Sequence, residues 1–171
     1  MFYKSINIMI KLNKKTKQDF LSPDRVKKLE ELGCYLNDAK YCIIRSKLEP
    51  LNQFVIYVDT TRYPYGWKDC VSHPENFEYV CNTYTLPELL LKLPEWIGKD
   101  GYKALTFFKD APFYGFYYNT EDDKDMDSPY AEYPLIAGYN CLLWCIMNNY
   151  GYVDYVGDKG DTELDIDIDN A

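Results

Sequence analysis

Apolar and polar residues alternate along several short stretches in the first half of the chain. The segment SINIMIKL (5–12) places isoleucine or leucine at every even position, and QFVIYVDT (53–60) sets Phe54, Ile56 and Val58 against Val55, Tyr57 and Asp59. KYCIIRS (40–46) and FEYVCNTY (77–84) are rich in β-branched and aromatic residues. A period of two is typical of strands with one buried face. These four segments are therefore predicted to be strands.

Three other segments combine apolar residues at helical spacing with residues that cap helices. SPDRVKKLEELG (22–33) has a serine at the N-cap, a proline at the first helical position and a glycine as terminator. TLPELLLKLPEWIG (85–98) opens with the T-x-x-E spacing of a capping box, and Pro94 is expected to end or kink its helix. The third helix, about 134–149, begins at Pro134 and is followed by Gly151.

Two aromatic-rich segments, 102–109 and 113–119, are separated by Asp-Ala-Pro and predict a hairpin. Interspersed helices and strands with short links indicate an α+β fold, with a largely antiparallel sheet, about three helices packed on one face and a buried last helix. Residues 1–152 are expected to form a single domain, and residues 153–171 an acidic tail.

The last predicted helix is the most apolar part of the chain and raises the question of a membrane or metal role. Its apolar run from Leu135 to Met147 is shorter than the ~20 residues that span a bilayer, so no membrane segment is predicted. Cys141 and Cys145 lie on one helix face, but the chain has no C-x-x-C motif and only one histidine. A structural zinc needs four ligands. Both cysteines are therefore predicted to be core residues, and no metal or cofactor is expected.

The net charge of −8 is unevenly distributed along the sequence. Residues 1–33 carry more bases than acids, whereas residues 152–171 carry seven acids against Lys159. A protein with a net negative charge repels polyphosphates, so nucleic-acid binding is not expected. The N-terminus is a poor signal peptide, so a cytoplasmic protein is expected. Because disulfides are rare in the cytoplasm, the six cysteines are expected to be free thiols.

Two segments carry candidate chemistry. The acidic segment EDDKDMD (121–127) suggests a binding site at Glu121, Asp123, Asp125 and Asp127. The EF-hand pattern requires glycine at position six and glutamate at position twelve. Ser128 and Pro134 stand there, so a calcium loop is not predicted, and a solvated acidic loop is the simpler interpretation. His73 lies three residues after Cys70, a spacing that rarely gives catalytic geometry, and is interpreted as a surface residue.

TYTLPELLLKLPEWI (83–97), a tyrosine-rich hairpin and EYPLIAGYNCLLWCIMNNYGY (132–152) follow one another in the C-terminal half. This arrangement resembles small uncharacterised proteins of phages and mobile elements of gut Bacteroidales, in which a helix of the form lP.YTL.dLL..LP..I precedes strands and a closing helix similar to A..MLCWCIENGYI. The resemblance covers residues 82–152 and departs at Asn149–Tyr150–Gly151, where the pattern has NGY. The matching positions are core and capping residues, namely Tyr84, Thr85, Leu86, Leu89, Leu90, Leu93, Pro94, Ala137, Leu142, Leu143, Trp144, Cys145, Ile146 and Tyr150. The resemblance implies a phage or mobile-element origin and no defined activity.

Aromatic residues make up 17% of the chain, including 18 tyrosines, which predicts either a tyrosine-lined sheet surface or an interaction surface. The P-loop, dinucleotide-binding, nucleophile-elbow and zinc-protease motifs are all absent from the sequence. The sequence therefore predicts a non-enzymatic accessory protein that contacts a host or phage protein in the host cytoplasm. A homodimer is considered as a further form of the protein. Two alternatives stay open: an enzyme with an unrecognised site, and an acidic mimic of nucleic acid that inhibits a host nuclease or defence protein.

Overall fold

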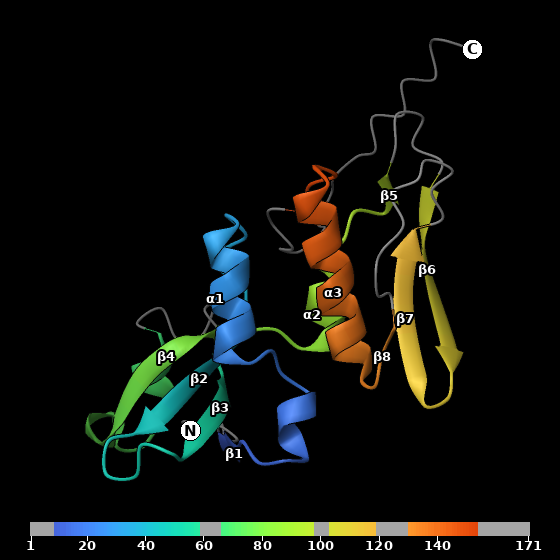
Figure 1. Cartoon of the computed structure of the whole chain (residues 1–171). Coiled ribbons are helices and arrows are strands. Elements are labelled where there is room, and N and C mark those ends of the chain that lie inside the picture. Colours follow the sequence, from blue (N-terminus) through green and yellow to red (C-terminus); the bar gives the residue numbers. More distant parts are fainter. Residues whose placement is uncertain (1–8, 59–65, 98–102, 119–129, 154–171) are drawn as a thin grey trace, which may run out of the picture.

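The computed structural model describes residues 9–58, 66–97, 103–118 and 130–153. These residues contain three α-helices, three short 3-10 helices (η) and eight strands (Figure 1). In chain order the elements are β1 (Met9–Lys11), η1 (Thr16–Gln18), α1 (Pro23–Glu31), β2 (Tyr41–Ser46), β3 (Gln53–Tyr57), η2 (Trp67–Cys70), η3 (Pro74–Asn76), β4 (Phe77–Thr83), α2 (Leu86–Lys92), β5 (Trp96–Ile97), β6 (Lys103–Asp110), β7 (Phe113–Tyr118), β8 (Tyr130–Ala131) and α3 (Pro134–Met147).

The first sheet is built from the N-terminal strands in the order β1-β3-β2-β4, and each neighbouring pair is antiparallel. Ile43 and Val55 are buried together with Phe20, which precedes α1. Ile44 and Ile56 belong to a different apolar cluster, which includes Cys70 of η2. Alternate residues of one strand point to opposite faces. The sheet therefore buries apolar side chains on both faces.

The second sheet has the order β5-β6-β7-β8 and is also antiparallel. Its centre is the predicted hairpin of β6 and β7, which pair from Leu105 opposite Tyr118 to Asp110 opposite Phe113. The two-residue strand β8 extends the sheet next to β7.

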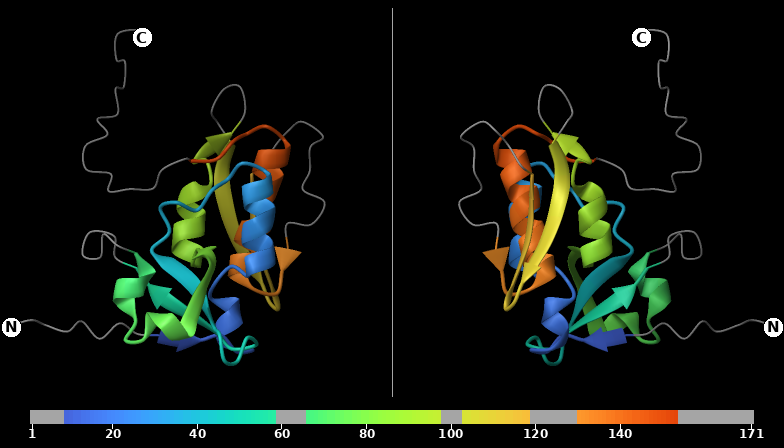
Figure 2. Two further views of the ribbon diagram at one scale, coloured as in Figure 1. Left: turned by 90° about the vertical axis from the view of Figure 1, so that its left-hand side faces the viewer. Right: turned by 90° about the vertical axis from the view of Figure 1, so that its right-hand side faces the viewer.

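Helices α2 and α3 lie between the two sheets, and α1 lies beside β4 (Figures 1 and 2). The main core joins α1, α2 and α3 to β7: it contains Leu29 of α1, Leu89 of α2, Leu142 of α3 and Phe116 of β7. The predicted α+β class, antiparallel pairing and buried last helix are thus confirmed, with the strands divided between two sheets.

The predicted N-caps of α1 and α2 are present in the structure. The Ser22 side chain accepts a hydrogen bond from the backbone N–H of Arg25, and Thr85 and Glu88 form a capping box. Helix α3 ends at Met147, two residues before the predicted boundary. Asn149 has φ 60° and Gly151 has φ 78°, a left-handed conformation that stops an α-helix.

In the part of the chain that the structure describes, no helix is long and apolar enough to cross a membrane. The apolar helix α3 has 14 residues, against the ~20 that a bilayer requires.

Candidate functional site

The predicted binding residues Glu121, Asp123, Asp125 and Asp127 belong to the segment 119–129, which lies outside the described residues. The same is true of residues 154–171, most of the predicted acidic tail. These two segments hold the charge excess, because the described residues contain 14 Lys and Arg against 13 Asp and Glu. The fold that the structure describes is therefore close to neutral, although the whole chain has a net charge of −8.

The hairpin of the second sheet carries aromatic residues on both of its faces. On the inner face Phe116 and Tyr118 are buried, and the ring of Tyr118 stacks on Trp144 of α3 at a centroid distance of 6.3 Å. The Tyr118 hydroxyl donates a hydrogen bond to the carbonyl of Pro94. Phe116 and Tyr118 are part of the core, whereas Phe107, which lies opposite Phe116 on the same face, is 52% exposed.

The other face of the hairpin, the outer aromatic face, points away from α3. Strand alternation and register assign its members, because residues opposite each other share a face. They are Thr106, Phe108, Asp110, Phe113, Tyr117 and Tyr130, with Gly115 among them. Four of these six side chains are aromatic.

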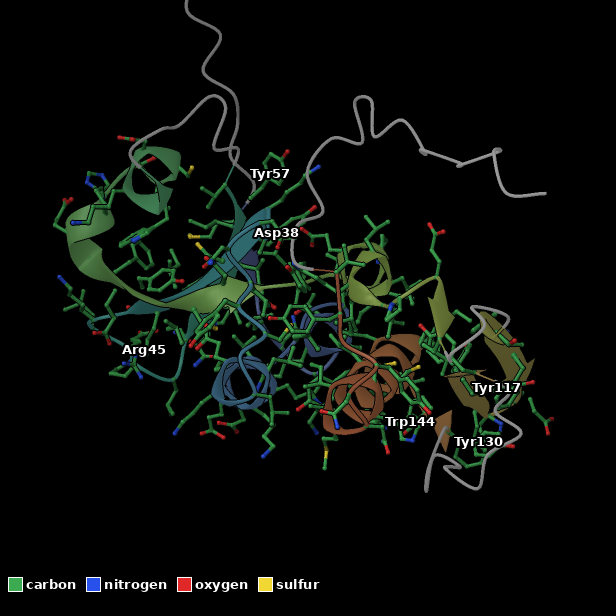
Figure 3. All side chains as sticks on the ribbon, turned by 90° about the horizontal axis from the view of Figure 1, so that it is seen from above. Asp38, Arg45, Tyr57, Tyr117, Tyr130 and Trp144 are labelled. Carbon is green, nitrogen blue, oxygen red and sulfur yellow. The ribbon has the colours of Figure 1, made fainter. Side chains whose placement is uncertain are left out.

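The rings of the outer aromatic face pack edge to face across three strands. Phe108 of β6 lies 4.8 Å from Tyr130 of β8 at an interplanar angle of 80°, and 5.6 Å from Tyr117 of β7 at 65°. This geometry is favourable for aromatic pairs. Tyr130 is nevertheless 53% exposed and Phe113 49% exposed. Figure 3 shows Tyr117 and Tyr130 at the opposite end of the molecule from Arg45 of the first sheet.

Gly115 makes this packing possible. A Cβ atom built on Gly115 would lie only 2.1 Å and 2.4 Å from two ring atoms of Phe108, Cε1 and Cζ. The Phe108 ring therefore covers the glycine opposite it on the neighbouring strand. Glycine at this position permits a close approach of ring to backbone, so the ring is held against the sheet between Tyr117 and Tyr130.

A buried ion pair joins the connector after α1 to the end of α2. The Lys92 ammonium lies 3.0 Å from a carboxylate oxygen of Asp38, and the two side chains are 0% and 6% exposed. The Tyr84 hydroxyl donates a hydrogen bond to the other Asp38 oxygen, and Lys92 lies 5.8 Å from the centre of the Tyr84 ring. Burial, with the bond to Asp38 as the second cause, raises the pKa of the Tyr84 phenol.

The Asp38–Tyr84–Lys92 cluster stabilises the packing of α2 against the connector after α1. A substrate cannot reach it, because Lys92 and the Tyr84 side chain are almost fully buried. The backbone N–H of Val153 also donates to the Lys92 carbonyl at 2.9 Å, which fixes the chain after α3. Sequence reasoning missed the cluster. A single lysine inside the apolar run LLLKLP was its only local signal.

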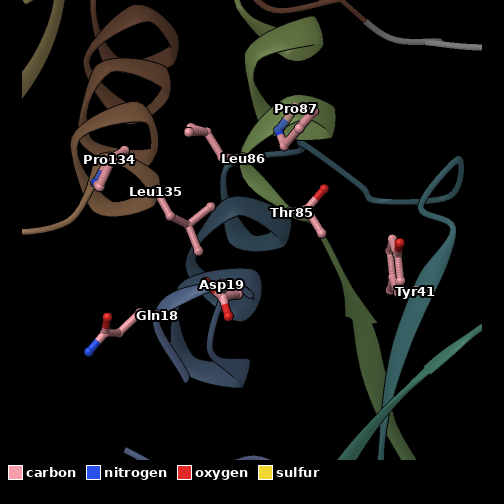
Figure 4. Close-up of a pocket in the computed structure, with 8 residues that line it drawn as sticks. All are labelled: Gln18, Asp19, Tyr41, Thr85, Leu86, Pro87, Pro134 and Leu135. Carbon is pink, nitrogen blue, oxygen red and sulfur yellow. The ribbon is translucent and has the colours of Figure 1, made fainter. Parts of the chain in front are cut away.

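An open groove of about 420 Å³ lies where the N-terminal ends of α2 and α3 approach η1 and β2 (Figure 4). Its walls are mainly apolar, and its polar groups come from Gln18, Asp19, Tyr41 and Thr85. Asp19 is its one carboxylate and is exposed to solvent. A shallow groove with a single solvated carboxylate lacks the paired acid and base that hydrolytic chemistry requires.

The cysteines and the histidine do not form a catalytic or metal site within the described residues. His73 is exposed, as predicted, and its Nδ1 lies 3.2 Å from Glu75, whereas the buried Cys70 thiol is 3.8 Å from the carbonyl of Gly66. Cys141 and Cys145 are buried in the core, as predicted. In the ranges that the structure describes, no three His, Cys, Asp or Glu side chains are arranged to hold a metal ion.

The thiols are expected to be unreactive in the folded protein. No disulfide joins the six cysteines, and burial raises the pKa values of Cys42 and Cys81 to about 12. Since only the thiolate reacts, the reactive fraction of each of these two thiols at pH 8 is roughly one in ten thousand. Labelling with a disulfide reagent at pH 8 should be slow before denaturation and should reach six thiols after it. Labelling should accelerate as the pH approaches 12, and rapid native labelling at pH 8 would contradict this expectation.

The fold and its surface thus define an α+β protein with an aromatic sheet face as its most distinctive exposed feature. No protein-family model matches the chain, and neither curated proteins nor solved structures show significant similarity to it.

Proposed function

We propose that this chain is a non-enzymatic accessory protein of a phage or mobile element, which acts by protein–protein contact in the host cytoplasm. The observation that carries this proposal is the outer aromatic face, because it presents four aromatic side chains from three strands to one side of a sheet. The resemblance of residues 82–152 to phage and mobile-element proteins supports the stated origin.

Aromatic side chains on an exposed sheet face favour a role in binding. Tyrosine and phenylalanine are enriched in the buried centres of protein interfaces, since their rings bury a large area at a small cost in conformational entropy. Phe108 and Tyr117 are held by their neighbours, so little further ordering is needed when a partner covers them. The hydroxyl groups of Tyr117 and Tyr130 keep this surface compatible with water in the absence of the partner.

The experiment is an affinity capture from a lysate of a gut Bacteroidales host that compares three forms of the tagged full chain. The second form carries Phe113→Ser with Tyr130→Ser, which removes two half-exposed rings from the outer aromatic face. The control carries Tyr35→Ser, because Tyr35 is 57% exposed but belongs to the connector after α1. We expect one host protein in stoichiometric amount with the unchanged chain and the control, and its loss with the double variant.

Two results would contradict the proposal. A partner that is retained equally by all three forms would place the contact elsewhere, and a nuclease retained in this way would favour the acidic mimic. An empty capture, combined with turnover of a small molecule by the purified chain, would favour the enzyme alternative.

A further inference from the structure

We infer that one end of the first sheet, formed by the β2–β3 turn and the segment after β1, binds the surface of an anionic lipid bilayer. This surface is separate from the outer aromatic face, so the inference goes beyond the proposed function and does not depend on it.

The β2–β3 turn presents the two most exposed large apolar side chains of the described residues. Leu48 is 84% exposed and Leu51 is 99% exposed, and Pro50 between them is also exposed. Apolar side chains that are exposed together mark a surface that meets an apolar partner or phase. The turn is therefore a candidate for insertion into an apolar medium.

Hydrogen bonds within the turn fix its conformation. The backbone N–H of Glu49 donates to the Ser46 hydroxyl at 3.1 Å, and the N–H of Asn52 donates to the Glu49 carbonyl at 2.8 Å. The Asn52 side-chain amide also donates to the Glu49 carboxylate. Because the turn is ordered in advance, little conformational entropy is lost when its apolar side chains are buried.

The segment after β1 lies at the same end of the sheet as this turn. The backbone N–H of Leu12 donates to the carbonyl of Gln53 at 2.9 Å, so the chain leaves β1 beside the residue at which β3 begins (Figures 1 and 2). The N–H of Lys17 donates to the Asn13 carbonyl at 2.9 Å, which holds η1 close to this end. The turn and the segment after β1 therefore face the same surroundings.

These two segments hold five exposed lysines. None of the five forms an ion pair with another described residue. The leucine–lysine end consists of Leu48, Leu51 and these lysines, namely Lys11, Lys14, Lys15, Lys17 and Lys47.

The charge of this end is positive even when the neighbouring start of β4 is included. Residues 11–19, 45–53 and 74–78 hold six Lys and Arg against four Asp and Glu, a net charge of +2. Two of the acids lie on the β4 side, where Glu78 pairs with Arg45 and Glu75 lies 3.2 Å from His73. The five lysines on the turn and the β1 side face only two acids, Asp19 and Glu49. The leucine–lysine end therefore attracts an anionic surface.

An anionic lipid bilayer matches both properties of the leucine–lysine end. Binding at a membrane surface strengthens with the apolar area buried in the interface and with the attraction between basic residues and anionic lipids. Each Lys or Arg close to such a surface strengthens binding about fivefold. The cytoplasmic leaflet of a cell membrane is a surface of this kind.

Two other occupants fit the leucine–lysine end less well. A nucleic acid supplies phosphates but no apolar phase, and its bases stack on aromatic rings rather than on leucine. In a symmetric contact, a second copy of the chain would bring two positive ends together, and these repel each other.

The test measures co-sedimentation of the purified full chain with lipid vesicles. One set of vesicles contains phosphatidylcholine alone, and the other contains phosphatidylcholine and phosphatidylglycerol in a two-to-one ratio. We expect binding to the anionic vesicles, with more than about tenfold weaker binding to the neutral ones. Added salt should weaken the binding to the anionic vesicles, because it screens the lysine charges.

Two double variants separate the apolar contribution from the charged one. Leu48→Ser with Leu51→Ser should weaken binding to the anionic vesicles about tenfold, because no apolar side chain of the turn then enters the interface. Lys14→Gln with Lys15→Gln should also weaken this binding about tenfold and should reduce its dependence on salt.

Each double variant has a matched control elsewhere in the fold. Leu91→Ser with Met147→Ser removes two exposed apolar side chains from α2 and α3, and Lys27→Gln with Lys28→Gln removes two exposed charges from α1. Both controls should bind the anionic vesicles as the unchanged chain does.

Absence of binding to the anionic vesicles would overturn the inference, and so would equal binding of the unchanged chain and the Leu48, Leu51 variant. Equal binding to the neutral and the anionic vesicles would also overturn it. If the leucine–lysine variants lose an acidic host protein in the affinity capture and the chain does not bind vesicles, this end contacts a protein instead. The proposed function is tested at Phe113 and Tyr130, so these results leave it unchanged.

Discussion

Replacement of Asp38 by alanine is expected to lower the free energy of unfolding by about 3–5 kcal/mol, because it removes the carboxylate that lies 3.0 Å from the buried Lys92 ammonium. The Tyr84 hydroxyl loses its acceptor in the same variant. Urea denaturation followed by far-UV circular dichroism measures this change as a shift of the midpoint.

The control for Asp38→Ala is Glu78→Ala, which breaks the ion pair between Arg45 and Glu78. The Nε atom of Arg45 lies 2.6 Å from a carboxylate oxygen of Glu78, but the two side chains are 41% and 45% exposed. An exposed pair contributes about 0–1 kcal/mol, so Glu78→Ala should have a much smaller effect. A double variant, Asp38→Leu with Lys92→Met, should recover part of the lost stability because it removes both buried charges. Equal effects of Asp38→Ala and Glu78→Ala would contradict the role assigned to the buried pair.

Replacement of Gly115 by alanine is expected to cost about 1–3 kcal/mol, the usual range for an overpacked site. The new methyl carbon would lie 2.1 Å and 2.4 Å from two ring atoms of Phe108, closer than non-bonded carbon atoms can approach. The ring must therefore move, and its contacts with Tyr117 and Tyr130 are lost. Near-UV circular dichroism of the aromatic side chains, together with urea denaturation, detects both consequences.

Gly138→Ala is the matched control for Gly115→Ala. A Cβ atom at Gly138 would lie 3.3 Å and 3.4 Å from the ends of the Leu89 and Leu86 side chains, so these flexible ends need to shift by only a few tenths of an ångström. Alanine also favours the interior of a helix by up to about 1 kcal/mol over glycine. Stability should therefore change little, with an unaltered near-UV spectrum. If both variants lose the same stability, the Phe108 ring does not depend on Gly115.

The sequence predicts the elements of this fold well because their signals are local. Ser22, the Thr85–Glu88 pair and the alternation in 53–60 act over a few residues, and the structure has α1, α2 and β3 at these places. The division into two sheets could not be predicted, since alternation says which face of a strand is buried but not which strand lies beside it.

For the candidate site, the sequence predicts an abundance of aromatic residues but not which of them share a face of the sheet. Consecutive aromatic residues in FYGFYY (113–118) give both faces of β7 the same character, so the sequence alone does not say which face meets α3. The buried charge of Lys92 was missed for a different reason. Its partner Asp38 lies in a connector far away in the sequence, and the two meet only when α2 packs beside that connector.

The two sheets have a consequence for the speed and order of folding. Each sheet is made from strands close together in the chain, the first within residues 9–83 and the second within residues 96–131. The hairpins β2–β3 and β6–β7 close short loops and form early, whereas the pairings β1–β3 and β2–β4 join more distant residues and form later. The hydrogen bond from the Tyr152 hydroxyl to the carbonyl of Gly33 joins residues 119 positions apart. We therefore expect the sheets to form first, and the docking of α3 with residues 150–153 onto α1 and its connector to complete the fold.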